Sequence, residues 1–217
     1  EVYYKGVTRE VDVNVSSGAT IFNSAEAVGK VNVPLNNRYN AISIPLVQDS
    51  YAINDVIGNQ LDVGDQIHPW LYGNQNYRIL TKTQNGSGQK VFPENGMITS
   101  EGFLVYLVSR PADILTLVGR VKDALPDRTL GFRYNSMGLP FPVSKEIERV
   151  GFTPTVSDQI HFWNYAAQNY EILTYLSSGW NYRAGEKYKV DFSLSEGKLF
   201  YIPTGTSSPQ IWNLRLR

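Results

Sequence analysis

Cysteine is absent from this chain of 217 residues, and histidine occurs only twice. Without cysteine the chain has no disulfide framework, no thiolate zinc site and no cysteine nucleophile. Charged residues make up only 18% of the chain, and 20 basic residues balance 20 acidic ones. A neutral chain lacks the basic surface that nucleic-acid binding needs and the positive charge that attracts anionic lipid. We therefore expect no nucleic-acid partner.

Long hydrophobic runs are also missing, and a membrane-spanning helix needs about 18 consecutive apolar residues. We expect no membrane span. The chain opens on Glu1 rather than on methionine, which is typical of a mature chain whose signal peptide has been removed. The sequence thus predicts an extracellular or cell-surface protein. It leaves open whether the two sequons, at Asn14 and Asn85, are glycosylated.

An internal duplication organises the chain. Residues 65–70 read DQIHPW, and residues 158–163 read DQIHFW. Residues 75–81 read QNYRILT, and residues 168–174 read QNYEILT. Further matches follow in the same order, which is the signature of repeated structural units.

The duplication predicts two homologous units without a flexible linker. We place the first at residues 28–120 and the second at 121–217, and residues 1–27 form an N-terminal extension. The C-terminal residues 211–217 resemble residues 114–120, so we expect them to close the second unit.

Within each unit the apolar residues alternate with polar ones, as at Val31, Val33 and Leu35. This is the period of a half-buried strand. Short strands separated by turn signals predict a β-sandwich or a small barrel. Apolar residues three to four apart at 52–57 and 144–150 predict one or two helical turns in each unit. The expected fold class is therefore all-β, with two tandem units and an N-terminal strand.

The N-terminal extension contains a strong strand signal. Val7, Arg9, Val11, Val13 and Val15 lie on one side of a period-two pattern. A lone strand must add to a sheet to satisfy its backbone. It can add to a sheet of its own chain, or it can be donated to a neighbouring subunit. Donation in a head-to-tail sense generates an open filament.

The ordered motifs resemble a family of secreted bacterial proteins of the planctomycete and verrucomicrobium type, which carry two copies of a β-rich unit. The resembling segments are residues 27–31, 39–46, 64–70 and 100–106. The second unit departs from the pattern because Lys198 stands where the first has Phe103. The resemblance implies secretion, β architecture and duplication. It implies no enzyme activity and no catalytic residues.

Catalytic and metal-binding motifs are scarce. The two histidines, His68 and His161, occupy equivalent repeat positions inside apolar strands, which favours a structural role for both. The alternative is a metal site between the units, which Asp65 and Asp158 could join. The sequence has no nucleophile elbow, P-loop or calcium-loop motif. It therefore predicts a protein that is not an enzyme, with no catalytic, cofactor-binding or metal-binding residues and no cofactor.

Aromatic residues are the remaining functional candidates. Trp70 and Trp163 recur in the two units, which favours a place in the core. Trp180, Tyr182 and Trp212 occur only in the second unit. They are therefore candidates for an interface or for stacking on a glycan, because tryptophan and tyrosine are enriched at binding surfaces.

Two hypotheses follow for the function. The leading one is a secreted structural subunit that assembles with copies of itself into an extracellular filament or surface layer, by donating the strand at residues 7–15. The alternative is a secreted carbohydrate-binding or adhesin module that uses aromatic platforms.

Overall fold

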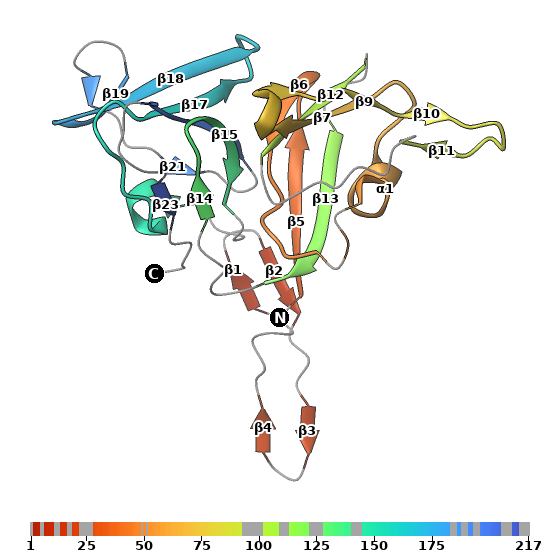
Figure 1. Ribbon diagram of the computed structural model, residues 1–217. Helices are drawn as coiled ribbons and strands as arrows, with labels where there is room; N and C mark the ends of the chain where they lie inside the picture. Colours follow the sequence, from red (N-terminus) through yellow and green to blue (C-terminus); the bar gives the residue numbers. More distant parts are fainter. Residues whose placement is uncertain are drawn as a thin grey trace.

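Strands form nearly all of the regular structure in the computed structural model (Figure 1), which confirms the all-β class. The described residues contain no helix that is long and apolar enough to cross a membrane. The structure describes residues 2–4, 7–10, 14–16, 19–21, 28–48, 50, 52–92, 102–108, 113–121, 128–139, 145–182, 186–187, 191–192, 196–204 and 210–212.

We call residues 28–121 the first half of the molecule. Most of its strands lie in two antiparallel sheets, of orders β1-β2-β5-β13 and β6-β12-β7-β8, where β1 and β2 come from the N-terminal extension and β9 also pairs with β7. The first sheet contains β1 (Val2–Tyr4), β2 (Val7–Glu10), β5 (Val28–Leu35) and β13 (Asp113–Arg120). The second contains β6 (Arg38–Ile42), β7 (Gln66–Leu71), β8 (Asn76–Tyr77), β9 (Leu80–Thr81) and β12 (Phe103–Leu107).

We call residues 128–212 the second half. Its main sheet has the order β15-β22-β17-β18-β19-β20, and β14 pairs with β23. The strands of the main sheet are β15 (Arg133–Gly138), β17 (Gln159–Asn164), β18 (Asn169–Leu176), β19 (Gly179–Tyr182), β20 (Glu186–Lys187) and β22 (Gly197–Ile202). The paired short strands are β14 (Arg128–Leu130) with β23 (Gln210–Trp212), and β16 (Lys145–Glu146) with β21 (Asp191–Phe192).

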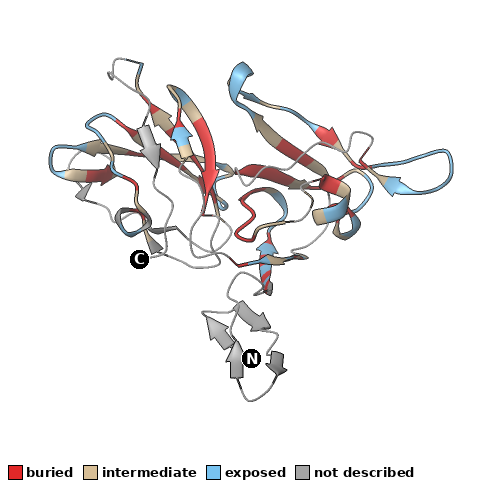
Figure 2. Ribbon diagram, turned by 60° about the horizontal axis from the view of Figure 1, so that its bottom comes forward, coloured by how far each residue is buried: buried red, intermediate tan, exposed pale blue. Residues whose placement is uncertain are grey.

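Short hairpins and helical turns complete the structure. The predicted helical turns are confirmed as α1 (Ile53–Val56) with the 3-10 turn η2 (Gly58–Gln60), and as η4 (Ile147–Val150). A further 3-10 turn, η3 (Tyr72–Asn74), follows β7. The hairpin of β10 (Thr83–Gln84) and β11 (Lys90–Val91) is largely exposed (Figure 2).

The strand order repeats between the halves. β6-β12-β7 corresponds to β15-β22-β17, and β5-β13 corresponds to β14-β23. The register repeats as well, because Tyr39 pairs with Tyr106 and Tyr134 pairs with Tyr201. Residues 211 and 212 of the expected closing strand lie in β23, which pairs with β14, and residues 213–217 lie outside the described part. A duplication produces this repetition, but the division into separate sandwich or barrel units at residues 27/28 and 120/121 stays a prediction.

Each half has its own hydrophobic core. In β5 the predicted alternation is visible, because Val31, Val33 and Leu35 are buried while Lys30 and Asn32 are exposed. Burial of such a side chain contributes about 1.5–3 kcal/mol. The first core includes Leu35, Ile53, Ile67, Phe92 and Phe103, and the second includes Ile147, Phe152, Trp180 and Phe200.

The N-terminal extension forms two hairpins. β2 pairs with β1 on one side and with β5 on the other, within the same chain. The second hairpin joins β3 (Asn14–Ser16) to β4 (Ala19–Ile21), and Figure 1 shows it beyond the two main sheets.

Candidate functional site

The predicted assembly strand at residues 7–15 is described in two parts, Val7–Glu10 as β2 and Asn14–Ser16 as β3. Val7 and Arg9 lie in β2, where Arg9 pairs with Val2 and with Gly29. Val15 lies in β3 and pairs with Thr20 of β4. Val11 and Val13 lie outside the described residues.

The predicted glycan or interface aromatics lie in different environments. Trp180 is only 3% exposed, and its ring meets that of Tyr175 edge-on at 5.2 Å in the second core. It therefore offers no open face to a sugar, and its position is structural. Tyr182 is half-buried beside Phe162. Trp212 ends β23, where it pairs with Arg128, and its side chain lies outside the described part.

The two histidines sit in identical settings. His68 and His161 are 4% and 6% exposed, and each ring Nε2 lies within 3.1 Å of the side-chain oxygen of the glutamine two residues earlier. Burial lowers the pKa of both, and that of His161 to about 4. Both rings are therefore neutral at pH 7, and each meets a tyrosine of its own half edge-on.

The side chains of the buried aspartates, Asp65 and Asp158, accept hydrogen bonds from nearby turns. Asp65 accepts hydrogen bonds from the backbone N–H groups of Asp62 and Val108. Asp158 accepts hydrogen bonds from the backbone N–H and the hydroxyl of Thr155. Among the described residues, no three His, Asp or Glu side chains come together as metal ligands would.

Repeated residues instead build the junction between the two halves. The indole Nε1 of Trp70 donates to the backbone oxygen of Tyr134 at 3.3 Å, and that of Trp163 donates to the backbone oxygen of Tyr39 at 3.0 Å. Each bond runs from one half to the other, and the two are reciprocal. Reciprocal contacts of this kind are those of a two-fold, isologous interface.

Two glutamines reinforce the junction in the same reciprocal way. The side-chain oxygen of Gln75 accepts from the backbone N–H of Tyr134 at 2.8 Å, and that of Gln168 accepts from Tyr39 at 3.0 Å. Both glutamines have a φ of 51°, in the left-handed region. This conformation costs about 1–3 kcal/mol in a residue other than glycine. The hydrogen bonds across the junction offset that cost.

Tyr77 and Tyr170, which occupy the same repeat position, meet each other. Their hydroxyl oxygens lie 2.7 Å apart. Burial raises the pKa of Tyr77 to about 12, and burial also raises the pKa of Tyr170. The pair therefore stays neutral and hydrogen-bonded at any physiological pH.

At the junction, the backbones of the two halves also lie close to each other. A Cβ added at Gly197 would lie 2.6 Å from the backbone oxygen of Ile42 in the other half. The hydroxyl of Ser136 donates to the backbone oxygen of Gly102 at 2.6 Å, and the hydroxyl of Ser43 donates to that of Glu196 at 3.2 Å. The sequence revealed the repeated motifs but not this junction. The apolar pattern of a strand does not tell which part of the chain packs against the strand.

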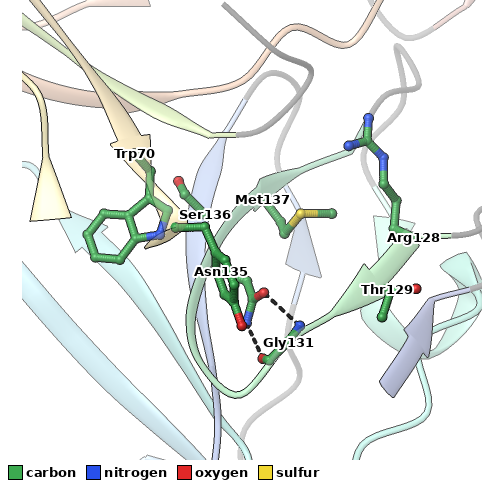
Figure 3. Close-up of a pocket in the computed structure, with 8 residues that line it drawn as sticks. Trp70, Arg128, Thr129, Gly131, Asn135, Ser136 and Met137 are labelled. Atoms are coloured by element: carbon green, nitrogen blue, oxygen red, sulfur yellow. Dashed lines mark hydrogen bonds between the residues drawn. The ribbon is translucent and has the colours of Figure 1, made fainter. Parts of the chain in front are cut away.

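A cavity of about 350 Å³ opens beside the junction. Trp70 and Tyr72 line it from the first half, and residues of β14 and β15 line it from the second. Figure 3 shows Trp70 on one side and Arg128 with Thr129 on the other. The amide of Asn135 both accepts from and donates to the backbone of Gly131, at 3.0 and 2.8 Å, and so fixes the turn between β14 and β15.

Comparison with known proteins adds no identification. Neither protein-family models, nor curated protein sequences, nor solved structures match the chain. The resemblance to the duplicated secreted bacterial proteins therefore stays an expectation from short motifs.

Proposed function

We propose that this chain is a secreted, non-enzymatic structural subunit that assembles with copies of itself outside the cell. The accessory position of the N-terminal extension carries the proposal. β1 and β2 add to the edge of β5, outside the strands that recur in both halves. The corresponding strand β14 pairs with β23 and with no such hairpin among the described residues. The extension is thus an addition to the repeated architecture.

Exchange of this hairpin between copies is the proposed assembly step. β2 pairs with β5 through the register Thr8↔Lys30, Arg9↔Gly29 and Glu10↔Val28. Main-chain hydrogen bonds of this kind form equally well within one chain or between two chains. The structure has the pairing within the chain, so assembly requires β2 to swap onto the β5 of a neighbour. A head-to-tail swap does not close and builds an open polymer.

Two further features support association. The β3–β4 hairpin lies beyond the main sheets in Figure 1, and an isolated two-stranded hairpin is marginally stable in water. A surface of another chain would stabilise it. The outward face of β13 carries Ile114 and Val118, which are 61% and 52% exposed. With zero net charge, copies of the chain repel one another little.

A disulfide trap tests the swap directly, because the chain has no cysteine of its own. The variant Thr8→Cys with Lys30→Cys places one thiol on each strand of the β2–β5 pair. Directly opposed residues in an antiparallel pair have Cα atoms about 4.5–5.5 Å apart, within the range that a disulfide spans. After oxidation of the assembled protein, we expect a ladder of covalent oligomers on a non-reducing gel and filaments in the electron microscope.

The matched control is Asn32→Cys with Thr116→Cys, which joins β5 to β13 inside one half. These two residues are paired, and their side chains hydrogen-bond at 3.0 Å. The control pair should give only the monomer band. If the Thr8 and Lys30 pair also gives only a monomer band and the protein sediments as a monomer, the proposal is wrong.

A further inference from the structure

The cavity beside the junction has no part in the proposed strand exchange, and its polar lining is not repeated. The second half lines it with several residues that have no counterpart in the first half. Arg128, Thr129, Gly131 and Ser136 stand where the first half has Val33, Pro34, Asn36 and Ala41.

The first half thus makes the same connection between its sheets without a guanidinium or a hydroxyl at these positions. Asn40 holds its turn through the amide, accepting from the backbone N–H of Asn36 at 2.6 Å, as Asn135 does in the second half. Arg128 and Thr129 are therefore particular to the second half.

The aromatic wall of the cavity is held in a fixed position. Tyr72 is 48% exposed, and its hydroxyl donates to the backbone oxygen of Phe132 at 3.1 Å. A Cβ at Gly131 would overlap this hydroxyl, so only glycine lets the tyrosine lie over the turn. Trp70 extends the wall, and its indole is oriented by the bond to Tyr134. Such electron-rich ring faces attract the C–H groups on the face of a sugar ring.

The wall of the cavity opposite Trp70 contains a positively charged side chain, Arg128. Arg128 and Thr129 lie across the cavity from Trp70 (Figure 3). A guanidinium presents five N–H donors in a planar fork that fits a carboxylate. The volume of about 350 Å³ lies at the small end of ligand sites and suits one or two sugar rings.

We propose that this cavity binds a sugar that carries a carboxylate, of the uronic-acid class. The ring stacks on the wall of Trp70 and Tyr72, and the carboxylate pairs with Arg128. A neutral sugar satisfies only the first of these contacts, and a simple carboxylate such as acetate satisfies only the second. Selectivity for a ligand with both groups is the expected property of the site.

Binding is tested by titrating the full chain with galacturonate and digalacturonate, followed by calorimetry and tryptophan fluorescence. We expect saturable binding of the acidic sugars, with glucose and acetate each at least tenfold weaker. Arg128→Gln should weaken the binding of the acidic sugars at least tenfold. Gly131→Ala should do so too, because the added methyl displaces Tyr72.

The matched control is Arg133→Gln, which removes an exposed arginine that does not line the cavity. It should bind like the unaltered chain, and circular dichroism checks that every variant is folded. The proposal is overturned if the unaltered chain shows no binding of digalacturonate. It is also overturned if Arg128→Gln binds as well as Arg133→Gln, or if glucose binds as tightly as galacturonate.

Discussion

His68 and His161 show how duplication explains residues that could otherwise suggest catalysis. Each ring is buried beside a tyrosine and hydrogen-bonded to the glutamine two residues earlier in its strand. Both are held neutral, because burial lowers their pKa values. The repeat predicted a structural role for both, and these settings support that role.

The neutral histidines make stability depend on pH. A histidine in the unfolded chain takes up a proton below about pH 6.5, whereas folded His161 resists protonation until about pH 4. Its contribution is therefore fully present above pH 6.5 and is lost as the pH falls toward 4. We expect a loss of about 1 kcal/mol from this residue between pH 6.5 and 5.5, measured by urea unfolding.

The control for this prediction is His161→Phe, which keeps an aromatic ring and removes the titrating group. Carboxylates titrate alike in both proteins, so the difference in slope reports the histidine. A variant that loses stability with falling pH as steeply as the unaltered chain would contradict the prediction.

At the scale of elements, the alternating pattern of Val31, Val33 and Leu35 predicted a strand and its buried face, which β5 confirms. The same pattern at Ile42, Ile44 and Leu46 predicted a strand that the structure does not have, because β6 ends at Ile42. It also predicted one strand over residues 7–15, and residues 11–13 of that segment lie outside the described part of the chain. Val7–Glu10 forms β2 and Asn14–Ser16 forms β3, in two separate hairpins. A period-two pattern sets the face of a strand but does not set its partner.

The close contact between the start of β22 and the end of β6 gives an element-scale prediction. Gly197→Ala forces a Cβ to within 2.6 Å of the Ile42 backbone oxygen, and that backbone belongs to the other half. We expect a loss of about 1–3 kcal/mol in the free energy of unfolding, as for overpacked cores. Gly86→Ala is the matched control, because nothing lies within 4 Å of a Cβ there. Equal urea midpoints for the two variants would show that the junction is looser than described.

At the scale of the whole molecule, the two halves interact as the subunits of a symmetric dimer do, although one chain carries both. Each half has its own core, and a small third cluster of Ala41, Leu104 and Trp163 joins them. Junction hydrogen bonds such as those of Trp70 and Trp163 satisfy backbone groups of the other half. Separation would expose these aromatic side chains and leave the backbone groups to water.

This arrangement predicts that the halves associate when they are made as separate chains. Fragments 1–121 and 122–217, refolded together, should elute as a one-to-one complex in size-exclusion chromatography with light scattering. The double variant Gln75→Ala with Gln168→Ala removes the reciprocal hydrogen bonds of these glutamines across the junction. It should weaken the complex at least tenfold, since several hydrogen bonds of about 0.5–1.5 kcal/mol are lost. Two fragments that elute as separate folded monomers would contradict the prediction.

The sequence by itself determined the all-β class, the helical turns at 53–60 and 147–150, and the internal repeat. These depend on local periodicity and on self-similarity, which are properties of the chain alone. Only the tertiary structure decided that Trp180 is buried, that β2 pairs within its own chain, and that Trp70 and Arg128 face one cavity. Local patterns specify which face of an element is apolar, whereas the surface that covers that face depends on contacts between residues far apart in the chain.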